Sequence, residues 1–267
     1  MSLKIVVLAK QVPDTHNVGA DAMNADGTVN RAALPTVFNP EDLKALEMAL
    51  QVKDQVPGST VTVVTMGPPR AAEIIKDARN RGADDGFVLS DARFAGADTL
   101  ATSYALSQAI RQVGHVDLIF GGRQAIDGDT AQVGPQIAEH LHTPMISYVA
   151  GVEFDGKDKL TVKKEDEDGY QMLEVHTPAL LTVLASAFKP RYMTVKGILD
   201  AYDEKEIEIW NVDKIDVDEA KLGLNGSPTR VKRSFTKPQK VAGEVFDVTP
   251  EEAVDLIVAK LKEKFII

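Results

Sequence analysis

The sequence predicts an α/β protein, with a doubly wound parallel sheet in three αβα layers, an antiparallel extension and a C-terminal arm. Over the first two-thirds of the chain, short β-branched runs alternate with amphipathic helical stretches, a pattern typical of a parallel sheet covered on both faces. After residue 150 the pattern changes to short apolar runs around charged turns. With 267 residues, the chain is long enough for one large domain with an appendage.

Hydrophobic periodicity places the elements of the predicted sheet in order along the chain. The predicted strands are residues 3–9, 61–65, 86–89, 117–121 and 145–149. The predicted helices lie between them, at about 40–56, 68–81, 98–113 and 133–142. The helix at 40–56 has its own start signal, because Asn39 is a typical N-cap and Pro40 suits the first helical position. Glu41 and Asp42 follow at the positive end of the helix dipole.

The C-terminal part of the chain is predicted to differ from the sheet domain. Residues 152–184 are predicted to form short antiparallel strands around charged turns. Residues 186–245 show little sustained periodicity, and we expect an extended arm there. Thr249 and Glu252, with Pro250 between them, form a capping box that opens a final amphipathic helix. The apolar face of that helix needs a cover, either on another chain or on its own domain. The predicted domains are 1–190 and 191–267.

Composition excludes several classes of function. A net charge of -10 disfavours unspecific binding to nucleic acid or to an anionic membrane, because both carry negative charge. The absence of cysteine excludes disulfides, thiolate catalysis and cysteine-ligated metals, and the five histidines show no metal-ligand spacing. No apolar run approaches the ~18 residues of a membrane span, and the first apolar run is too short for a signal peptide. We therefore expect a soluble, cytoplasmic protein without membrane insertion.

The most informative segment is the loop at 121–135, which follows the predicted strand at 117–121. Open α/β sheets bind ligands at the carboxyl ends of such strands, and the glycines of this loop allow close approach of the backbone to a ligand. Pro135 is tolerated only in the first helical turn, so the amides of about 131–134 should lack intrahelical partners and could bind phosphate. Thr130 and Gln132 could add side-chain donors. An ordinary strand-to-helix loop capped by Asp129 or Thr130 is the alternative.

Two further strand ends, at 9–14 and 65–69, meet this loop if the first, second and fourth predicted strands are neighbours. Ala9 and Met66 would then offer small or soft surfaces to a purine, although a methionine such as Met66, taken alone, is more often a core residue than a ligand contact. The loop matches neither G-x-G-x-x-G nor the P-loop pattern, which argues against a Rossmann dehydrogenase and an ATPase. No nucleophile triad or acid–base pair is evident, so any redox chemistry must come from a bound cofactor.

Four ordered motifs carry a resemblance to a known family: residues 4–14, 38–42, 122–134 and 189–193. Together they resemble the β subunits of electron-transfer flavoproteins. The resemblance implies an adenine nucleotide alpha hydrolase-like fold and a heterodimer with an α subunit that carries FAD. It also implies a nucleotide site in this chain and an arm, within 191–267, that embraces the α subunit.

The resemblance assigns nucleotide contacts to residues of four segments: Ala9, Asn39, Pro40, Glu41, Asp42, Met66, Gly122, Arg123, Gln124, Ala125, Ile126, Asp127, Gly128, Asp129, Thr130, Ala131, Gln132, Val133 and Gly134. It assigns the docking of an acyl-CoA dehydrogenase to a recognition loop at 191–201. The docking residues that it implies are Arg191, Tyr192, Met193 and Val195, with Val195 as the apolar anchor. This loop is acidic here, through Asp200, Asp203, Glu204, Glu206 and Glu208, and lacks the lysines of the mitochondrial form, which leaves the choice of partner open.

The family divides into members that hold AMP in the β site and electron-bifurcating members that hold FAD there. The AMP-type loop commonly reads A-I-D-D-D-C-N-Q-T-G, whereas residues 125–134 read A-I-D-G-D-T-A-Q-V-G and resemble the bifurcating branch. Gly128 removes a carboxylate and leaves more room for a pyrophosphate.

The bifurcating branch implies a β-site FAD that accepts hydride from NADH. Its electrons would go to ferredoxin or flavodoxin and, through the α-subunit FAD, to an acyl-CoA dehydrogenase. A non-bifurcating carrier with structural AMP is the alternative, and a nucleotide-binding signalling module without redox function is a third.

Overall fold

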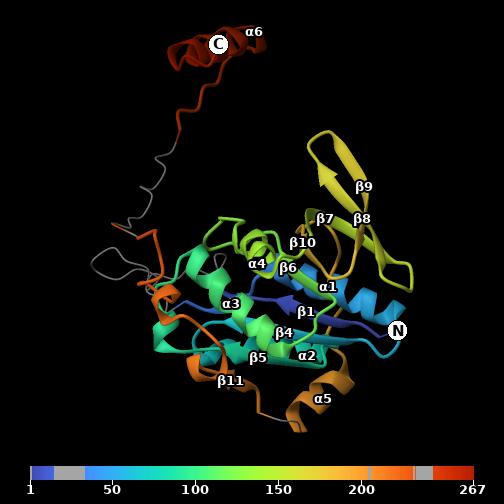
Figure 1. Cartoon of the computed structure of the whole chain (residues 1–267). Helices are drawn as coiled ribbons and strands as arrows, with labels where there is room; N and C mark the ends of the chain where they lie inside the picture. The colour runs from blue at the N-terminus through green and yellow to red at the C-terminus, as the bar shows by residue number, and fades with distance from the viewer. Residues whose placement is uncertain (1, 15–33, 204–205, 231, 233–242) are drawn as a thin grey trace. The chain divides into compact units, whose positions relative to one another are not determined.

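The computed structural model describes residues 2–14, 34–203, 206–230, 232 and 243–267. Contacts between residues divide the chain into two units, Met1–Arg233 and Ser234–Ile267. The first unit contains the sheet and the helices that cover it, and the second contains the C-terminal helix (Figure 1).

A nine-stranded sheet forms the centre of the first unit, among the residues that the structure describes. Its strand order is β11-β5-β4-β1-β6-β10-β7-β8-β9. The seven strands from β11 to β7 pair in parallel, and β8 and β9 continue the sheet as an antiparallel hairpin. The strands are β1 (Lys4–Leu8), β4 (Thr60–Met66), β5 (Asp85–Leu89), β6 (Leu118–Gly122), β7 (Met145–Phe154), β8 (Lys159–Asp166), β9 (Gly169–His176), β10 (Ala179–Val183) and β11 (Glu208–Trp210). A separate antiparallel pair joins β2 (Gln11–Pro13) to β3 (Thr36–Phe38).

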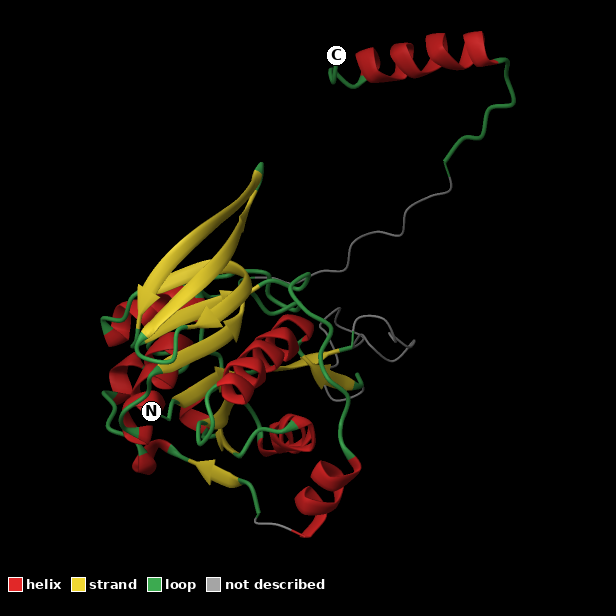
Figure 2. Ribbon diagram, turned by 90° about the vertical axis from the view of Figure 1, so that its right-hand side faces the viewer, coloured by secondary structure: helices red, strands yellow, loops and turns green. Residues whose placement is uncertain are grey.

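Helices cover both faces of the sheet, as Figures 1 and 2 show. On one face, α1 (Pro40–Gln55) and α2 (Ala72–Arg81) pack against the β1 residues Ile5 and Val7. On the other face, α3 (Thr99–Val113) and α4 (Val133–Leu141) pack against Val6 and Leu8. Because successive strand residues point to opposite faces, the continuous apolar run of β1 supplies both cores. The predicted three-layer, doubly wound α/β fold is confirmed.

Two segments differ from the sequence-based expectations. β10 is not antiparallel but runs parallel between β6 and β7, where all five of its residues are buried. The expected extended arm at 186–245 contains a helix, α5 (Val195–Asp203), and the edge strand β11. Beyond β11, Val212, Ile215 and Leu222 are buried in the core under α3, although their spacing follows no regular period. Residues 204–205, 231 and 233–242 of that segment lie outside the described residues.

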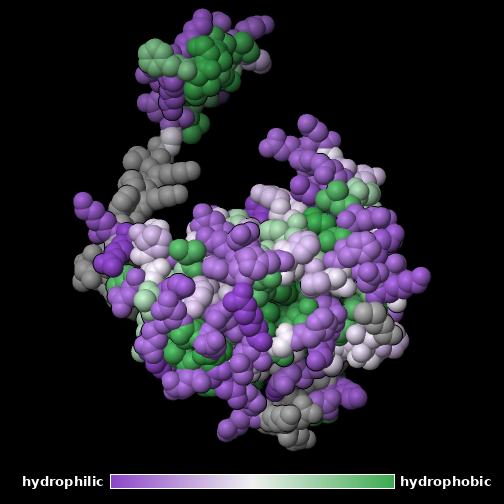
Figure 3. Space-filling model, in the orientation of Figure 1, coloured by the Kyte–Doolittle hydropathy of each residue, from purple (hydrophilic) through white to green (hydrophobic). Residues whose placement is uncertain are grey.

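The second unit contains α6 (Pro250–Glu263), which begins with the predicted capping box. The Thr249 side chain accepts from the Glu252 amide, and the Glu252 carboxylate accepts from the Thr249 amide. Val254 and Ile257 are exposed on this helix, and Figure 3 shows its hydrophobic surface. Within the described part of the chain, no helix is both long enough and apolar enough to span a bilayer.

Candidate nucleotide site

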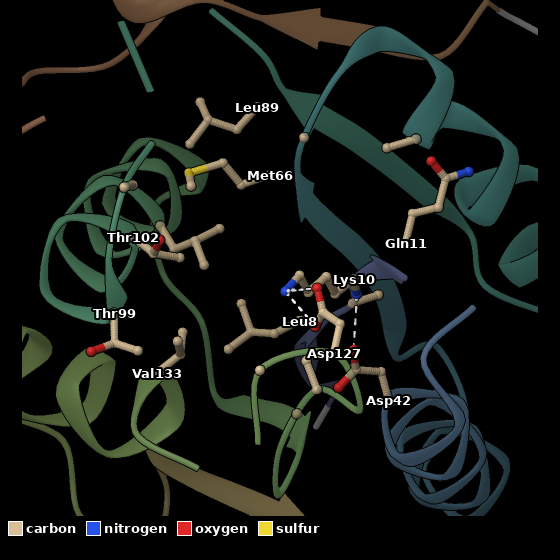
Figure 4. Close-up of a pocket in the computed structure, with 18 of the residues that line it drawn as sticks. Leu8, Lys10, Gln11, Asp42, Met66, Leu89, Thr99, Thr102, Asp127 and Val133 are labelled. Carbon is tan, nitrogen blue, oxygen red and sulfur yellow. Dashed lines mark hydrogen bonds and ion pairs between the residues drawn. The ribbon is translucent and has the colours of Figure 1, made fainter. Parts of the chain in front are cut away.

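A cavity of about 780 Å³ lies at the carboxyl ends of β1, β4, β5 and β6 (Figure 4). β1 is paired with β4 on one side and with β6 on the other, as expected for the first, second and fourth predicted strands. The chain winds from β1 through β4 to β5, and then returns to β6 on the far side of β1. The cavity therefore lies where the strand order reverses, which is where open α/β sheets bind ligands.

Most residues that the sequence assigns to the nucleotide contribute to the wall of this cavity. These are Ala9, Asp42, Met66, Gly122, Arg123, Gln124, Ala125, Asp127, Gly128, Thr130, Ala131, Gln132, Val133 and Gly134. Five assigned residues do not line the cavity: Asn39, Pro40, Glu41, Ile126 and Asp129. Asn39 and Glu41 lie behind the loop instead, and their contacts show what they do there.

Asn39 positions the loop rather than capping α1. It occupies the N-cap position, but its side chain makes no capping hydrogen bond. The fully buried side-chain amide donates to the Gln124 carbonyl at 2.9 Å and accepts from the Ile126 amide at 3.2 Å. A single asparagine thus satisfies one donor and one acceptor of the loop backbone, which ties the loop to the start of α1.

Glu41 makes a second tie between α1 and the loop. Its buried carboxylate accepts from the Gln124 amide at 3.0 Å and from the Arg123 guanidinium at 3.1 Å. The carboxylate raises the pKa of Arg123 through this hydrogen bond and its charge. Arg123 also lies over the ring of Tyr148, with 5.7 Å between the guanidinium carbon and the ring centroid. Arg123 is therefore held from two sides.

Asp42 joins the ends of two neighbouring strands. One carboxylate oxygen accepts from the Lys10 amide and the other from the Gly122 amide, both at 2.9 Å. The side chain is only 7% exposed, and this burial raises its pKa to about 7, against the opposing effect of its hydrogen bonds. A side chain at position 122 would not fit, because a Cβ there would lie 2.5 Å from an Asp42 carboxylate oxygen.

The loop itself leaves a row of amides without protein partners. The amides of Gly128 and Asp129 donate to the Ala125 carbonyl, which closes a turn. Asp129 and Ala131 then adopt left-handed backbone angles, with φ of 49° and 53°. In the described part of the chain, the amides of residues 130–134 donate to no protein acceptor, and the first backbone bond of α4 comes from Gln136. The expectation from Pro135, that amides 131–134 lack intrahelical partners, is confirmed.

The opposite wall of the cavity was missed by the sequence-based assignment. It consists of the end of β5, the segment before α3 and the first turn of α3, including Asp91, Asp98, Thr99 and Thr102. The Thr99 hydroxyl donates to the Gln132 side chain at 2.9 Å, so this wall touches the loop. A usable signal was present, because Asp98 is a typical N-cap and its carboxylate accepts from the Leu100 and Ala101 amides. Lys10 was also missed; it lines the cavity and forms an ion pair with Asp127, another lining residue.

The residues assigned to the recognition loop lie away from this cavity and divide into two groups. Tyr192 and Val195 are 79% and 76% exposed, and Met193 is also exposed, at 39%. Arg191 instead turns toward α1, where its amide and guanidinium donate to the buried carboxylate of Glu47 and its guanidinium also donates to Asp54. Arg191 thus anchors the segment, while its neighbours present apolar surface.

Comparison with known proteins agrees with this architecture. The model of the electron transfer flavoprotein domain matches residues 26–215. The electron transfer flavoprotein subunit beta of Clostridium acetobutylicum is 51% identical over 98% of this chain and 99% of its own length. The caffeyl-CoA reductase-Etf complex subunit CarD of Acetobacterium woodii is 48% identical, over 99% of this chain and 100% of its own. The acryloyl-CoA reductase electron transfer subunit gamma of Anaerotignum propionicum is 46% identical with the same coverage. The chain therefore belongs to the electron transfer flavoprotein family, among its β subunits.

Proposed function

We propose that this chain holds FAD in the cavity as the β subunit of a heterodimeric, electron-bifurcating flavoprotein. Through this FAD the complex takes a hydride from NADH. It passes one electron to ferredoxin or flavodoxin and the other, through the α-subunit FAD, to an acyl-CoA dehydrogenase. The proposal depends on one observation above all: the unpaired amides of residues 130–134 border a large cavity at the point where the strand order reverses.

These amides suit the anionic part of an adenine nucleotide. They stand at the start of α4, where backbone N–H groups and the helix dipole both favour negative charge. Thr130 and Gln132 add polar side chains to the same part of the wall, and Ala9 and Met66 offer apolar surface for a purine. Asn39, Glu41 and Asp42 hold the loop in place from behind.

Two features favour FAD over AMP. FAD is an AMP unit joined through a pyrophosphate to a flavin mononucleotide, so it needs more space than AMP, and the cavity holds about 780 Å³. Gly128 lines this cavity, and a Cβ at that position would have open space around it. An aspartate there, as in the AMP-type loop, would add a negative charge where a pyrophosphate would lie. When bound, the flavin supplies hydride acceptance and one-electron transfer, and the chain supplies binding and electrostatics.

The names of two relatives support a partner that acts on CoA thioesters. One is named as a subunit of a caffeyl-CoA reductase-Etf complex and the other as an electron transfer subunit of acryloyl-CoA reductase. Around the anchored Arg191, the exposed Tyr192 and Val195 provide apolar surface for docking such a partner. The exposed apolar residues of α6 provide a corresponding surface for the α subunit.

The decisive measurement is the nucleotide content of the co-purified heterodimer. Two FAD per dimer, with flavin reduction on addition of NADH, are the expected result. One FAD and one AMP per dimer would replace the proposal with the non-bifurcating carrier. A colourless complex without adenine nucleotide would contradict both.

A further inference from the structure

We infer that Lys10 is a further nucleotide-binding residue, whose ammonium group leaves Asp127 and binds a phosphate of the nucleotide in this cavity. This inference rests on the proposed function and identifies the residue that selects for the anionic part of the ligand. The observation behind it is an ion pair inside the cavity wall, in which both partners line the space that the nucleotide would occupy.

The backbone of Lys10 is fixed on both sides. Its amide donates to Asp42 at 2.9 Å, and its carbonyl accepts from the Asn39 amide at 2.9 Å. The side chain leaves this fixed point and reaches Asp127, with 2.7 Å and 2.9 Å from the ammonium nitrogen to the two carboxylate oxygens (Figure 4). The base of the side chain is therefore rigid, and only its flexible end has to move to change partner.

Several other charged groups of the cavity wall have structural partners. Arg123 is committed to the buried carboxylate of Glu41. The carboxylates of Asp42 and Asp98 accept backbone amides, so each has a structural task. Lys10 and Asp127 pair with each other, and their side chains are 47% and 15% exposed. A partly exposed ion pair contributes little free energy to stability. Breaking the contact with Asp127 to form one with a more highly charged phosphate therefore costs little free energy.

The distance along the chain also fits. Asp127 precedes Thr130, where the row of unpaired amides at 130–134 begins, by three positions, which span at most about 10 Å of extended chain. A phosphate held where this row begins would therefore lie near the Lys10–Asp127 pair, which lines the same cavity. Asp127 repels this phosphate while Lys10 attracts it, so the two residues have opposite effects on binding.

These opposite effects distinguish phosphate binding by Lys10 from a purely structural role of the ion pair. If the ion pair only holds the loop in shape, Lys10→Met and Asp127→Asn break the same contact and change affinity in the same direction. If Lys10 binds phosphate, Lys10→Met weakens nucleotide binding, whereas Asp127→Asn strengthens it by releasing Lys10 and removing a negative charge.

The test is calorimetric titration of the full-length chain, freed of bound nucleotide, with AMP and with adenosine. Lys10→Met should raise the Kd for AMP about tenfold or more, and Asp127→Asn should lower it. Neither change should alter the Kd for adenosine, which lacks the phosphate, and Lys10→Arg should restore AMP binding. Lys53→Met is the matched control, because it removes a 2.7 Å ion pair with Asp84 outside the cavity.

An unchanged Kd for AMP in Lys10→Met, or weaker AMP binding in Asp127→Asn, would overturn the inference. So would equal losses for AMP and adenosine in Lys10→Met, because they would indicate a disturbed loop. Failure of the unaltered chain to bind AMP or FAD at all would instead refute the proposed function itself. The two failures are therefore distinguishable.

Discussion

Replacing Asp42 with asparagine should remove a pH dependence from the stability of the fold. Asp42 lies between the ends of β1 and β6, and its burial raises the pKa of the carboxyl group from 3.8 to about 7. In the unfolded chain the group loses its proton near pH 3.8, whereas the folded chain keeps it until about pH 7. Stability from this group is thus fully present below pH 3.8 and is lost as the pH rises through 7.

The size of the effect follows from the separation of the two pKa values. One pKa unit corresponds to about 1.4 kcal/mol, so the whole loss amounts to roughly 4 kcal/mol. Part of this loss occurs below pH 5, because the Asp42 carboxyl group of the unfolded chain already ionises there. Between pH 5 and pH 8, the free energy of unfolding should therefore fall by about 2–3 kcal/mol more in the unaltered protein than in Asp42→Asn.

Urea denaturation of the nucleotide-free chain at several pH values measures this difference. Asp255→Asn, in an exposed position on α6, controls for the loss of a carboxylate as such. In Asp42→Asn, an NH₂ donor replaces the oxygen that accepts from one backbone amide. At pH 5 the variant should therefore be less stable than the unaltered chain. Parallel pH profiles for the unaltered chain and Asp42→Asn would refute the reasoning, because they would mean that Asp42 ionises in the folded state at its ordinary pKa.

Five further substitutions test how the loop at 121–135 and the segment at 191–201 are held. Asn39→Ala should lower the free energy of unfolding by about 2–4 kcal/mol, because it removes two buried hydrogen bonds. The purified variant should also contain less nucleotide. Full nucleotide content would show that the loop binds nucleotide without the Asn39 hydrogen bonds. Gly122→Ala should lower the free energy of unfolding by on the order of 2 kcal/mol in denaturation experiments, because a Cβ there meets Asp42. Gly128→Ala should change it by no more than about 0.5 kcal/mol, because a Cβ there has open space around it. Gly128→Asp should lower FAD affinity more than AMP affinity in titrations, and equal losses would argue against the pyrophosphate assignment. Glu47→Gln should weaken the ion pair that holds Arg191 and so slow electron transfer to the proposed acyl-CoA dehydrogenase partner, with flavin content unchanged. An unaltered rate would show that this ion pair does not support docking.

The helix α1 supports both regions that these substitutions address. Its first residues hold the nucleotide loop through Glu41 and Asp42. Further along, Glu47 and Asp54 hold Arg191 at the start of the recognition segment. Burial of Glu47 opposes its ionisation, but its hydrogen bonds to Arg191 outweigh this effect and lower the pKa of its carboxyl group. A single helix thus fixes the loop at 121–135 and the segment at 191–201 relative to each other.

The sequence by itself determined the features that depend on local interactions. Hydrophobic periodicity indicates the parallel strands and the helices between them. Pro40 indicates the start of α1, and Thr249 with Glu252 indicates the start of α6. The unpaired amides before Pro135 also follow from the chain alone, because a proline near a helix start leaves its neighbours without intrahelical partners.

Only the tertiary structure decided which distant groups meet. Asn39 suits an N-cap by its type, yet its side chain bonds to a loop more than 80 residues away. β10 joins the sheet in parallel, and the segment around Val212 packs into the core, because burial between other elements outweighs weak local preferences. Lys10 and Asp127 come together because β1 pairs with β6. Strand order depends on packing of the whole sheet, and local periodicity carries no information about it.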